Sequence, residues 1–229
     1  MSLSNAAIID TWFQNEIEEE GMTEDHGYLW RHMIESAPEK DFRNFQVLDY
    51  GCNRGGFLNM LHSMRPYRRG IGVDVAAQSL AIARQRHANL PIDFIQPHQM
   101  CRAAGNTDIA FSHEVLYLLP DLESHAACMA RTLKNGASYY AAIGCHTGNP
   151  LWMKWRKLIA QSTSLPVYDY SLDDYAKAFQ KAGMRVEMKA FQLPDFVLIK
   201  PDNAYFPKAA DSLQYHTNVK VIIRASMAG

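Results

Sequence analysis

The stretch VLDYGCNRGGF at residues 47–57 joins an apolar run ending in an acid to a turn that contains three glycines. Glycine has no side chain, so such a turn allows a ligand to lie directly against the backbone. A second acid, Asp74, lies near the end of the next apolar run, GIGVDV at 70–75. A turn flanked by the carboxylates of Asp49 and Asp74 indicates a site for a small ligand with hydroxyl groups or a positive charge.

Three kinds of ligand compete for this turn. A nucleoside triphosphate is disfavoured because its loop needs Lys followed by Ser or Thr after the glycines, and neither pair follows here. A nicotinamide dinucleotide is a nearer match, because Gly51-x-Asn53-x-x-Gly56 with Asp74 beyond it approaches the dinucleotide-binding pattern. However, the side chain of Asn53 hinders close approach of a pyrophosphate, and the carboxylate of Asp49 would repel it.

S-adenosylmethionine suits the same residues better, because it carries a sulfonium, an ammonium, a carboxylate and an adenosine but no phosphate. Asp49 can help to hold the ammonium through the loop or a water. Backbone N–H groups of the turn and of the helix start can meet the carboxylate. Asp74 can accept both ribose hydroxyls, and Arg54 is compatible with the turn because no phosphate has to touch the backbone there.

Secondary-structure elements must position these residues. Strand-like and helix-like segments alternate from about residue 45 to 145. The expected strands cover 45–50, 70–75, 92–97, 108–113 and 137–144. The expected helices between them cover 55–64, 76–87 and 121–134. This alternation predicts an α/β fold with a parallel sheet and helices on both faces. Ligands bind such sheets beyond the carboxyl ends of the strands, where the first glycine-rich turn lies.

The flanking regions complete a single expected domain over 1–229. Residues 1–40 form a helical cap, with an amphipathic helix at 5–20 that ends near Gly21 and a second helix at 27–36. Residues 41–145 form the cofactor-binding core. A helix at 171–183 and strands at 184–193 and 219–226 follow it. The segments 146–170 and 193–218 are rich in proline and aromatic residues and are interpreted as loop-rich insertions.

Three segments, VLDYGCNRGGFL, GIGVDVAAQSLAIAR and DIAFSHEVLYLLPDLESHAACMARTLKNGASYY, occur in the order typical of one family. Together they resemble the class I S-adenosylmethionine-dependent methyltransferases of types 11 and 12. The resemblance implies a three-layer, Rossmann-like fold with a mostly parallel seven-stranded sheet and an antiparallel last strand. Asp49, Gly51 and Gly55 match the family motif D-x-G-x-G-x-G, and Asn53 stands where a glycine is common.

The resemblance also implies which residues bind S-adenosylmethionine. Family members often have an Asp after the third strand that meets the adenine amino group. Counting from Phe94, that place falls on His98, so Gln99 is the alternative adenine contact. The residues predicted to bind the cofactor are Asp49, Gly51, Cys52, Asn53, Arg54, Gly55, Asp74, Val75, His98, Gln99, Ser112 and His113.

By the same resemblance, the reactive methyl group lies near Ser112-His113-Glu114, at the end of the fourth strand. His113 is the candidate catalytic residue, because an imidazole titrates near neutrality and can accept a proton from a hydroxyl or ammonium. Seating the cofactor is its alternative role. Glu114 is predicted either to hold a cationic substrate or to cap the next turn. The residues predicted to bind substrate are Tyr28, Glu114, His146, Trp152 and Tyr168, although the aromatic ones could equally form a small core.

Composition limits the remaining choices. The formal net charge of −1 gives no strong basic field for nucleic acid or an anionic membrane. The four cysteines are scattered, which disfavours a zinc site or a disulfide framework and suits a reducing compartment. The N-terminus lacks a secretory pattern, and no apolar run is long enough to span a bilayer.

We therefore predict a cytoplasmic S-adenosylmethionine-dependent methyltransferase, a monomer or homodimer without a metal, a nucleic acid or a membrane partner. It is expected to methylate an N or O nucleophile of a small molecule by in-line displacement. A tRNA or rRNA methyltransferase and an NAD-dependent oxidoreductase on a related fold remain the alternatives.

Overall fold

The computed structural model describes residues 16–163 and 165–229, and the side chains from residue 26 onward except those of residues 101, 102 and 164. Seven strands form one sheet: β1 (Gln46–Tyr50), β2 (Arg69–Val73), β3 (Ile92–Ile95), β4 (Thr107–His113), β5 (Leu133–Ile143), β6 (Arg185–Ala190) and β7 (Val221–Ser226). The α-helices are α1 (Glu16–Ser36), α2 (Gly56–Met64), α3 (Ala77–Arg86), α4 (Leu122–Thr132), α5 (Trp152–Ser162), α6 (Leu172–Lys181) and α7 (Ala209–Gln214). Shorter turns are η1 (Pro97–Ala103), η2 (Leu116–Leu118) and the π-helical turn η3 (Tyr215–Val219).

The strand order is β3-β2-β1-β4-β5-β7-β6. Strands β1 to β5 pair in parallel, and β7 runs antiparallel to both of its neighbours, β5 and β6. The predicted Rossmann-like sheet with an antiparallel last strand is therefore confirmed. The chain leaves β1 toward β2 on one side and returns to β4 on the other, which is the reversal point where such sheets bind ligands.

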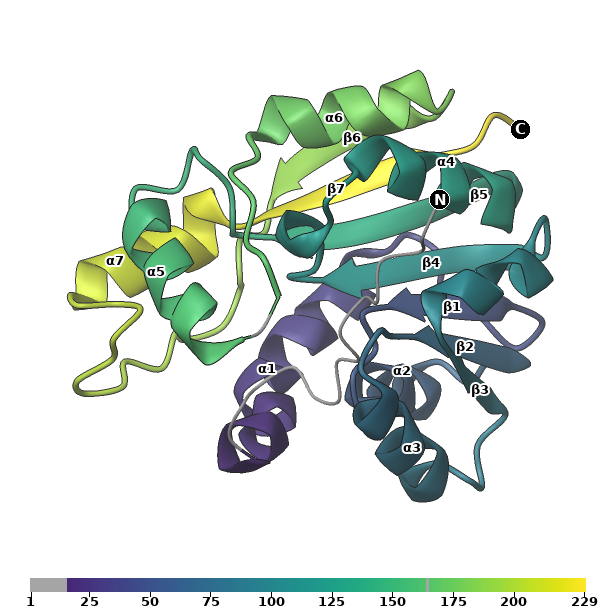
Figure 1. Ribbon diagram of the computed structural model, residues 1–229, viewed down its shortest axis with the longest axis horizontal. Coiled ribbons are helices and arrows are strands. Elements are labelled where there is room, and N and C mark those ends of the chain that lie inside the picture. The colour runs from purple at the N-terminus through teal and green to yellow at the C-terminus, as the bar shows by residue number, and fades with distance from the viewer. Residues whose placement is uncertain (1–15, 164) are drawn as a thin grey trace, which may run out of the picture.

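Helices cover both faces of the sheet and make three layers (Figure 1). Buried residues of α1, α2 and α3 pack with one face, for example Met33, Leu58 and Leu80. Residues of α4 and α6, including Met129 and Phe179, pack on the other face. Helices α5 and α7 lie beyond the carboxyl ends of β4 and β5, as Figure 1 shows, so they border the predicted site.

The N-terminal region differs from the prediction. The described helix α1 runs without a break from Glu16 to Ser36, so the predicted helix end near Gly21 is wrong. A glycine inside a helix costs only about 1 kcal/mol, which packing of the helix against the domain can outweigh. The C-terminal half of α1 is anchored in this way, because Met33 and Ile34 are buried. Residues 5–15 of the predicted first helix lie outside the described residues.

The two predicted loop-rich insertions also contain helices. Segment 146–170 contains α5, and segment 193–218 contains α7 followed by most of η3. In α5 the side chains of Trp152, Trp155 and Ile159 are buried at helical spacing. That periodicity was visible in the sequence, but the neighbouring prolines and aromatic residues favoured a loop. Among the described residues, no helix is long and apolar enough to cross a membrane.

Candidate active site

The turn between β1 and α2 has an unusual backbone. Gly51, Asn53 and Gly55 all have positive φ angles, of 83°, 46° and 82°. At Gly51 a Cβ atom would lie 2.3 Å from a methyl group of Val115, so only glycine fits there. Asn53 adopts the left-handed conformation that asparagine tolerates better than most residues. The turn thus keeps its shape although an asparagine replaces the usual glycine.

Asp74 braces this turn from the end of β2. One of its carboxylate oxygens accepts the Asn53 N–H at 2.7 Å, and the other accepts the Ala76 N–H at 2.8 Å. A carboxylate has about four lone-pair sites and can accept hydrogen bonds from several donors at once. Asp74 therefore has a structural role in this turn.

Asp49 lies on β1 and is buried, with 4% of its surface exposed. Burial, and secondly the charge of Asp74, raise the pKa of the Asp49 carboxyl well above its usual range. Two carboxylates that raise each other's proton affinity are stabilised by a nearby cation. The surroundings of the turn are therefore electrostatically suited to a positively charged ligand and unsuited to a pyrophosphate.

The side chains of Cys52 and Arg54 are both buried. Burial first, then the nearby carboxylates of Asp74 and Asp49, raise the pKa of the Cys52 thiol well above its usual value. The carbonyl group of Arg54 accepts a hydrogen bond from Nε2 of His87 at 3.1 Å, which ties the turn to the C-terminus of α3. These two residues help to hold the turn in place.

The residues after β2 and β3 that were predicted to bind the cofactor lie in different surroundings. Val75 has an exposed apolar side chain, with 42% of its surface accessible, directly after Asp74. His98 is exposed on η1. The amide oxygen of Gln99 already accepts the backbone N–H of Gln96 at 3.0 Å, so it caps the turn after β3.

The end of β4 directs two neighbouring residues to opposite faces of the sheet. Ser112 faces α4, where its hydroxyl lies 2.5 Å from that of Tyr139 and is buried. His113 faces α1, and its ring meets the edge of the His26 ring at 5.0 Å between centroids. Successive residues of a strand point to opposite faces, so the side chains of Ser112 and His113 lie on different faces of the sheet.

His113 has a buried Nε2 atom without a hydrogen-bond partner among the described residues. Burial, followed by the charges of Lys220 and His26, lowers the pKa of His113 well below its usual value. The imidazole is therefore neutral at physiological pH. A neutral imidazole can accept a proton or a hydrogen bond, although a lowered pKa makes it a weaker base.

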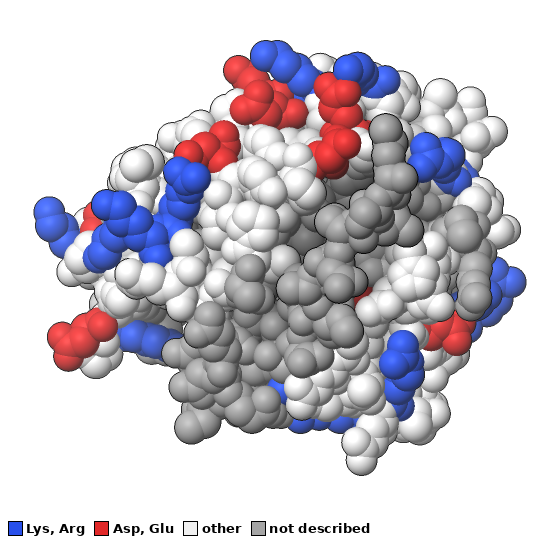
Figure 2. All heavy atoms as spheres, viewed as in Figure 1, with Lys and Arg blue, Asp and Glu red and all other residues white. Residues whose placement is uncertain are grey.

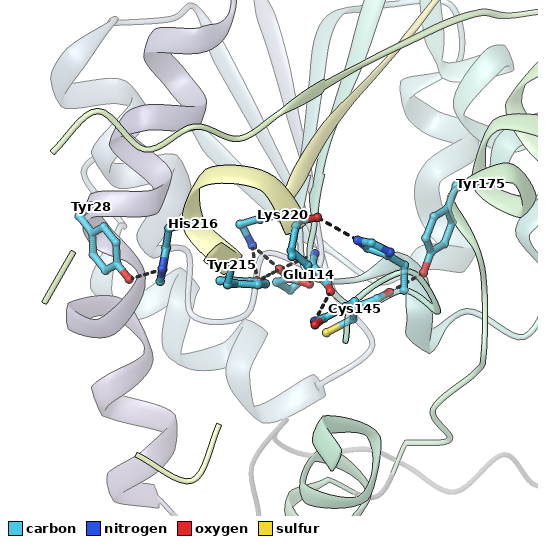
Figure 3. Close-up of polar contacts among 11 residues, drawn as sticks. Tyr28, Glu114, Cys145, Tyr175, Tyr215, His216 and Lys220 are labelled. Atoms are coloured by element: carbon cyan, nitrogen blue, oxygen red, sulfur yellow. Dashed lines mark hydrogen bonds and ion pairs between the residues drawn. The ribbon is translucent and has the colours of Figure 1, made fainter. Parts of the chain in front are cut away.

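Glu114 contributes to a buried network rather than to an open surface (Figure 3). Its carboxylate pairs with the ammonium of Lys220 and accepts hydrogen bonds from the Gly144 N–H and the Tyr215 hydroxyl, both at 2.9 Å. Burial alone would raise the pKa of Glu114, but the charge and hydrogen bonds of these partners lower it. Because Lys220 already pairs with it, these contacts favour the alternative role of Glu114 in the turn after β4 over the binding of a cationic substrate.

The other predicted substrate residues divide into two groups. Tyr28 is 43% exposed on α1, and its hydroxyl lies 3.1 Å from Nε2 of His216. Nδ1 of His216 must donate to the Ser212 carbonyl at 2.8 Å, so Tyr28 donates to Nε2. Tyr168 is partly buried and stacks on Tyr170.

His146 and Trp152 are enclosed instead. His146 is 3% exposed, and its Nε2 donates to the Val219 carbonyl at 2.9 Å. Trp152 is 2% exposed and donates its indole N–H to Asp169 at 2.8 Å. Trp152 thus belongs to the core that packs α5, which favours the predicted alternative of a small core over substrate binding at this residue.

Sequence reasoning missed Lys220, Tyr215 and His216, which all come from the region beside η3. They reach Glu114 and Tyr28 across roughly 100 to 190 positions of chain. The only local signal was a lysine at the start of an apolar strand, and a lysine there usually marks a solvent-exposed end. Its complete burial could be learned only from the folded chain.

Comparison with known proteins agrees with this geometry. Residues 47–136 match the family model described as a methyltransferase domain. A Haloferax volcanii methyltransferase solved with the Trm112 activator aligns over 93% of this chain and 95% of its own, with 20% identity and a TM-score of 0.77. No curated protein matches the chain.

Two further structures share the fold. Geranyl diphosphate C-methyltransferase from Streptomyces coelicolor, solved with S-adenosyl-L-homocysteine, aligns over 90% of this chain and 79% of its own, with 17% identity and a TM-score of 0.65. Phosphoethanolamine N-methyltransferase 2 from Haemonchus contortus, solved with S-adenosyl-L-methionine, aligns over 89% of this chain and 53% of its own, with 17% identity and a TM-score of 0.61.

Proposed function

We propose that this chain, a class I S-adenosylmethionine-dependent methyltransferase, transfers the methyl group to an N or O nucleophile of a small molecule. The observation that supports the site most strongly is the turn at 51–55, whose three positive φ angles open the backbone between two carboxylates. A cation would stabilise the charged forms of Asp49 and Asp74, whereas a pyrophosphate would oppose them, so the pair favours a cationic nucleoside over a dinucleotide and argues against the oxidoreductase alternative.

In this proposal each side of the crevice meets one part of the cofactor. Asp49 attracts the ammonium, and the free N–H groups at the start of α2 meet the carboxylate, because Gly55 offers no capping side chain there. Asp74 accepts the ribose hydroxyls, and Val75 packs against the adenine. When bound, S-adenosylmethionine supplies an electrophilic methyl group, and the protein's task is to hold the nucleophile in line with it.

The acceptor is proposed to lie between the end of β4 and α1. There, the neutral imidazole of His113 can accept a hydrogen bond or a proton from the nucleophile. Tyr28, whose hydroxyl is held by His216, forms an outer wall of this region. Glu114, which follows β4, is already paired with Lys220. An uncharged acceptor with a hydroxyl or amine fits these groups best.

A nucleic-acid acceptor is the weaker alternative. On the face shown in Figure 2, basic side chains gather over α5 at the left, while elsewhere basic and acidic side chains alternate. Within the α5 region, Arg156 is paired with Asp169 at 2.5 Å. A backbone-tracking surface needs several unpaired basic residues along one path. We therefore favour a small molecule.

Two measurements test the proposal. Isothermal titration calorimetry should detect binding of S-adenosylmethionine and S-adenosylhomocysteine, and reduced nicotinamide dinucleotide should give no heat. Transfer of radiolabelled methyl groups to fractionated small metabolites, tRNA, rRNA and protein should then label the small-molecule fraction. Labelling confined to RNA would overturn the choice of acceptor, and binding of only the dinucleotide would overturn the choice of cofactor.

A further inference from the structure

The feature that the proposed function leaves unexplained is a lysine buried at the carboxyl end of the sheet. The side chain of Lys220, at the junction of η3 and β7, has no exposed surface. Its ammonium pairs with Glu114 and lies 3.2 Å from the Tyr215 hydroxyl (Figure 3). Replacing a buried ion pair with apolar residues is often neutral or stabilising. Stability alone is therefore a weak reason for this pair.

The pair controls the backbone directly after His113. Glu114 has a φ angle of 54°, in the left-handed region that is unfavourable for a residue with a long side chain. Its carboxylate is held by the Gly144 N–H, the Tyr215 hydroxyl and Lys220. These contacts join the ends of β4, β5 and β7 at one point. They keep the turn after β4 in its left-handed form.

His113 lies directly before this turn. His113 is the last residue of β4, next to the strained residue, and its buried Nε2 has no partner among the described residues. The other titratable groups described around it are His26 from α1 and Lys220 from the β7 side. Lys220 in turn pairs with Glu114 and contacts Tyr215. Each of these groups sits on an element that contributes to the same end of the sheet.

We infer that the Lys220–Glu114 pair positions His113 in the acceptor site by locking the turn after β4 and placing a positive charge behind the imidazole. This inference rests on the proposed function, in which His113 meets the acceptor. Lys220 and Glu114 are positioning residues, because they pair with each other and act on His113 rather than on the substrate. The charge of Lys220 also favours the neutral imidazole, which is the form that accepts a hydrogen bond from a hydroxyl or an uncharged amine.

The test is an NMR titration of the His113 imidazole in the full chain, with the resonance assigned by its loss in His113→Asn. In Lys220→Met/Glu114→Gln, which removes both charges together, the His113 resonance should move and its titration midpoint should rise. The single variant Lys220→Arg, which keeps the positive charge, should have the wild-type titration midpoint. Affinity for S-adenosylmethionine, measured by calorimetry, should stay within about twofold, since neither residue touches the turn at 51–55.

Two controls keep the result unambiguous. Lys181→Met/Glu123→Gln removes an exposed ion pair of 2.5 Å on the far side of the sheet and should leave His113 unchanged. If the buried double variant does not fold, Tyr215→Phe removes only the hydroxyl between the two partners and should still shift the His113 resonance. An unchanged His113 titration in a folded variant would overturn the inference. Failure of the proposed function would appear separately, as an absence of cofactor binding or methyl transfer in the wild type.

Discussion

The buried carboxyl of Asp49 lowers the stability of the fold when it is charged, but the same charge favours binding of a cation. Its pKa is raised because burial and Asp74 disfavour its charge, so the folded state prefers the protonated carboxyl. The resulting penalty is absent below the unfolded pKa and is fully present above the folded one. A bound cation would relieve that penalty, which couples ligand binding to the charge of a buried acid.

Asp49→Asn should therefore stabilise the ligand-free protein at pH 8 and weaken S-adenosylmethionine binding by tenfold or more, about 1.4 kcal/mol. Thermal unfolding and calorimetry at pH 8 and pH 5 measure both effects. Wild-type affinity should fall as the pH decreases through the raised pKa, while the affinity of Asp49→Asn should stay nearly flat. Equal pH profiles for the two proteins would place the ammonium elsewhere.

Asp74→Ala should weaken cofactor binding and reduce the order of the turn between β1 and α2. The substitution leaves the N–H groups of Asn53 and Ala76 without their acceptor and removes the proposed partner of the ribose. The expected loss of affinity for S-adenosylhomocysteine is about 1–3 kcal/mol by calorimetry. Asp93→Ala, which removes only an exposed pair with Arg69, is the matched control. Unchanged affinity in a folded Asp74→Ala protein would contradict the placement of the sugar.

At the scale of elements, the turn between β1 and α2 is defined by backbone conformation more than by side-chain chemistry. The same three alternate positions, 51, 53 and 55, adopt positive φ whether they hold glycine or asparagine. Residue 53 can therefore vary among residues that tolerate this conformation. Residue 51 cannot vary, because Val115 closes the space on its side.

Asn53→Gly should keep affinity for S-adenosylmethionine within about threefold, whereas Asn53→Val should lose it, since a β-branched residue costs roughly 1–2 kcal/mol or more at positive φ. Gly51→Ala should be worse, and Gly51→Ala combined with Val115→Ala should recover only part of the loss, because the backbone cost remains. Calorimetry and thermal unfolding of the four variants measure this order. Tight binding by Gly51→Ala would show that the turn can rearrange.

At the scale of the whole molecule, several histidines are buried as neutral groups, and this sets the response to acid. Burial lowers the pKa of His125 to about 4, and His113 and His216 are lowered as well. A histidine with a lowered folded pKa stabilises the fold above its unfolded value near 6.5. That stabilisation is lost as the pH falls toward the folded value.

The free energy of unfolding should therefore fall between pH 6.5 and pH 4, by up to about 3 kcal/mol from His125 alone. Denaturant unfolding across this range measures the slope. His125→Gln keeps a polar side chain that does not titrate and should flatten the slope. His62→Gln, on the partly exposed end of α2, is the control for the substitution itself. A His125→Gln slope equal to wild type would contradict this account.

The sequence by itself determined the alternation of strands and helices from 45 to 145, the parallel sheet and the glycine turn between two acids. These features are local, because hydrophobic periodicity and turn residues act within a few positions. It also indicated the helix at 171–183, which the structure shows as α6. The family resemblance, which spans the same region, added the antiparallel last strand.

Only the tertiary structure decided which side chains meet at the end of the sheet. Sequence could not tell that α1 continues past Gly21, that α5 buries Trp152, or that Lys220 neutralises Glu114 from 106 positions away. Burial and pairing depend on which distant elements pack together, and this packing can override local propensity and exposure preferences. The binding turn could therefore be read from the chain, whereas the surroundings of His113 required the fold.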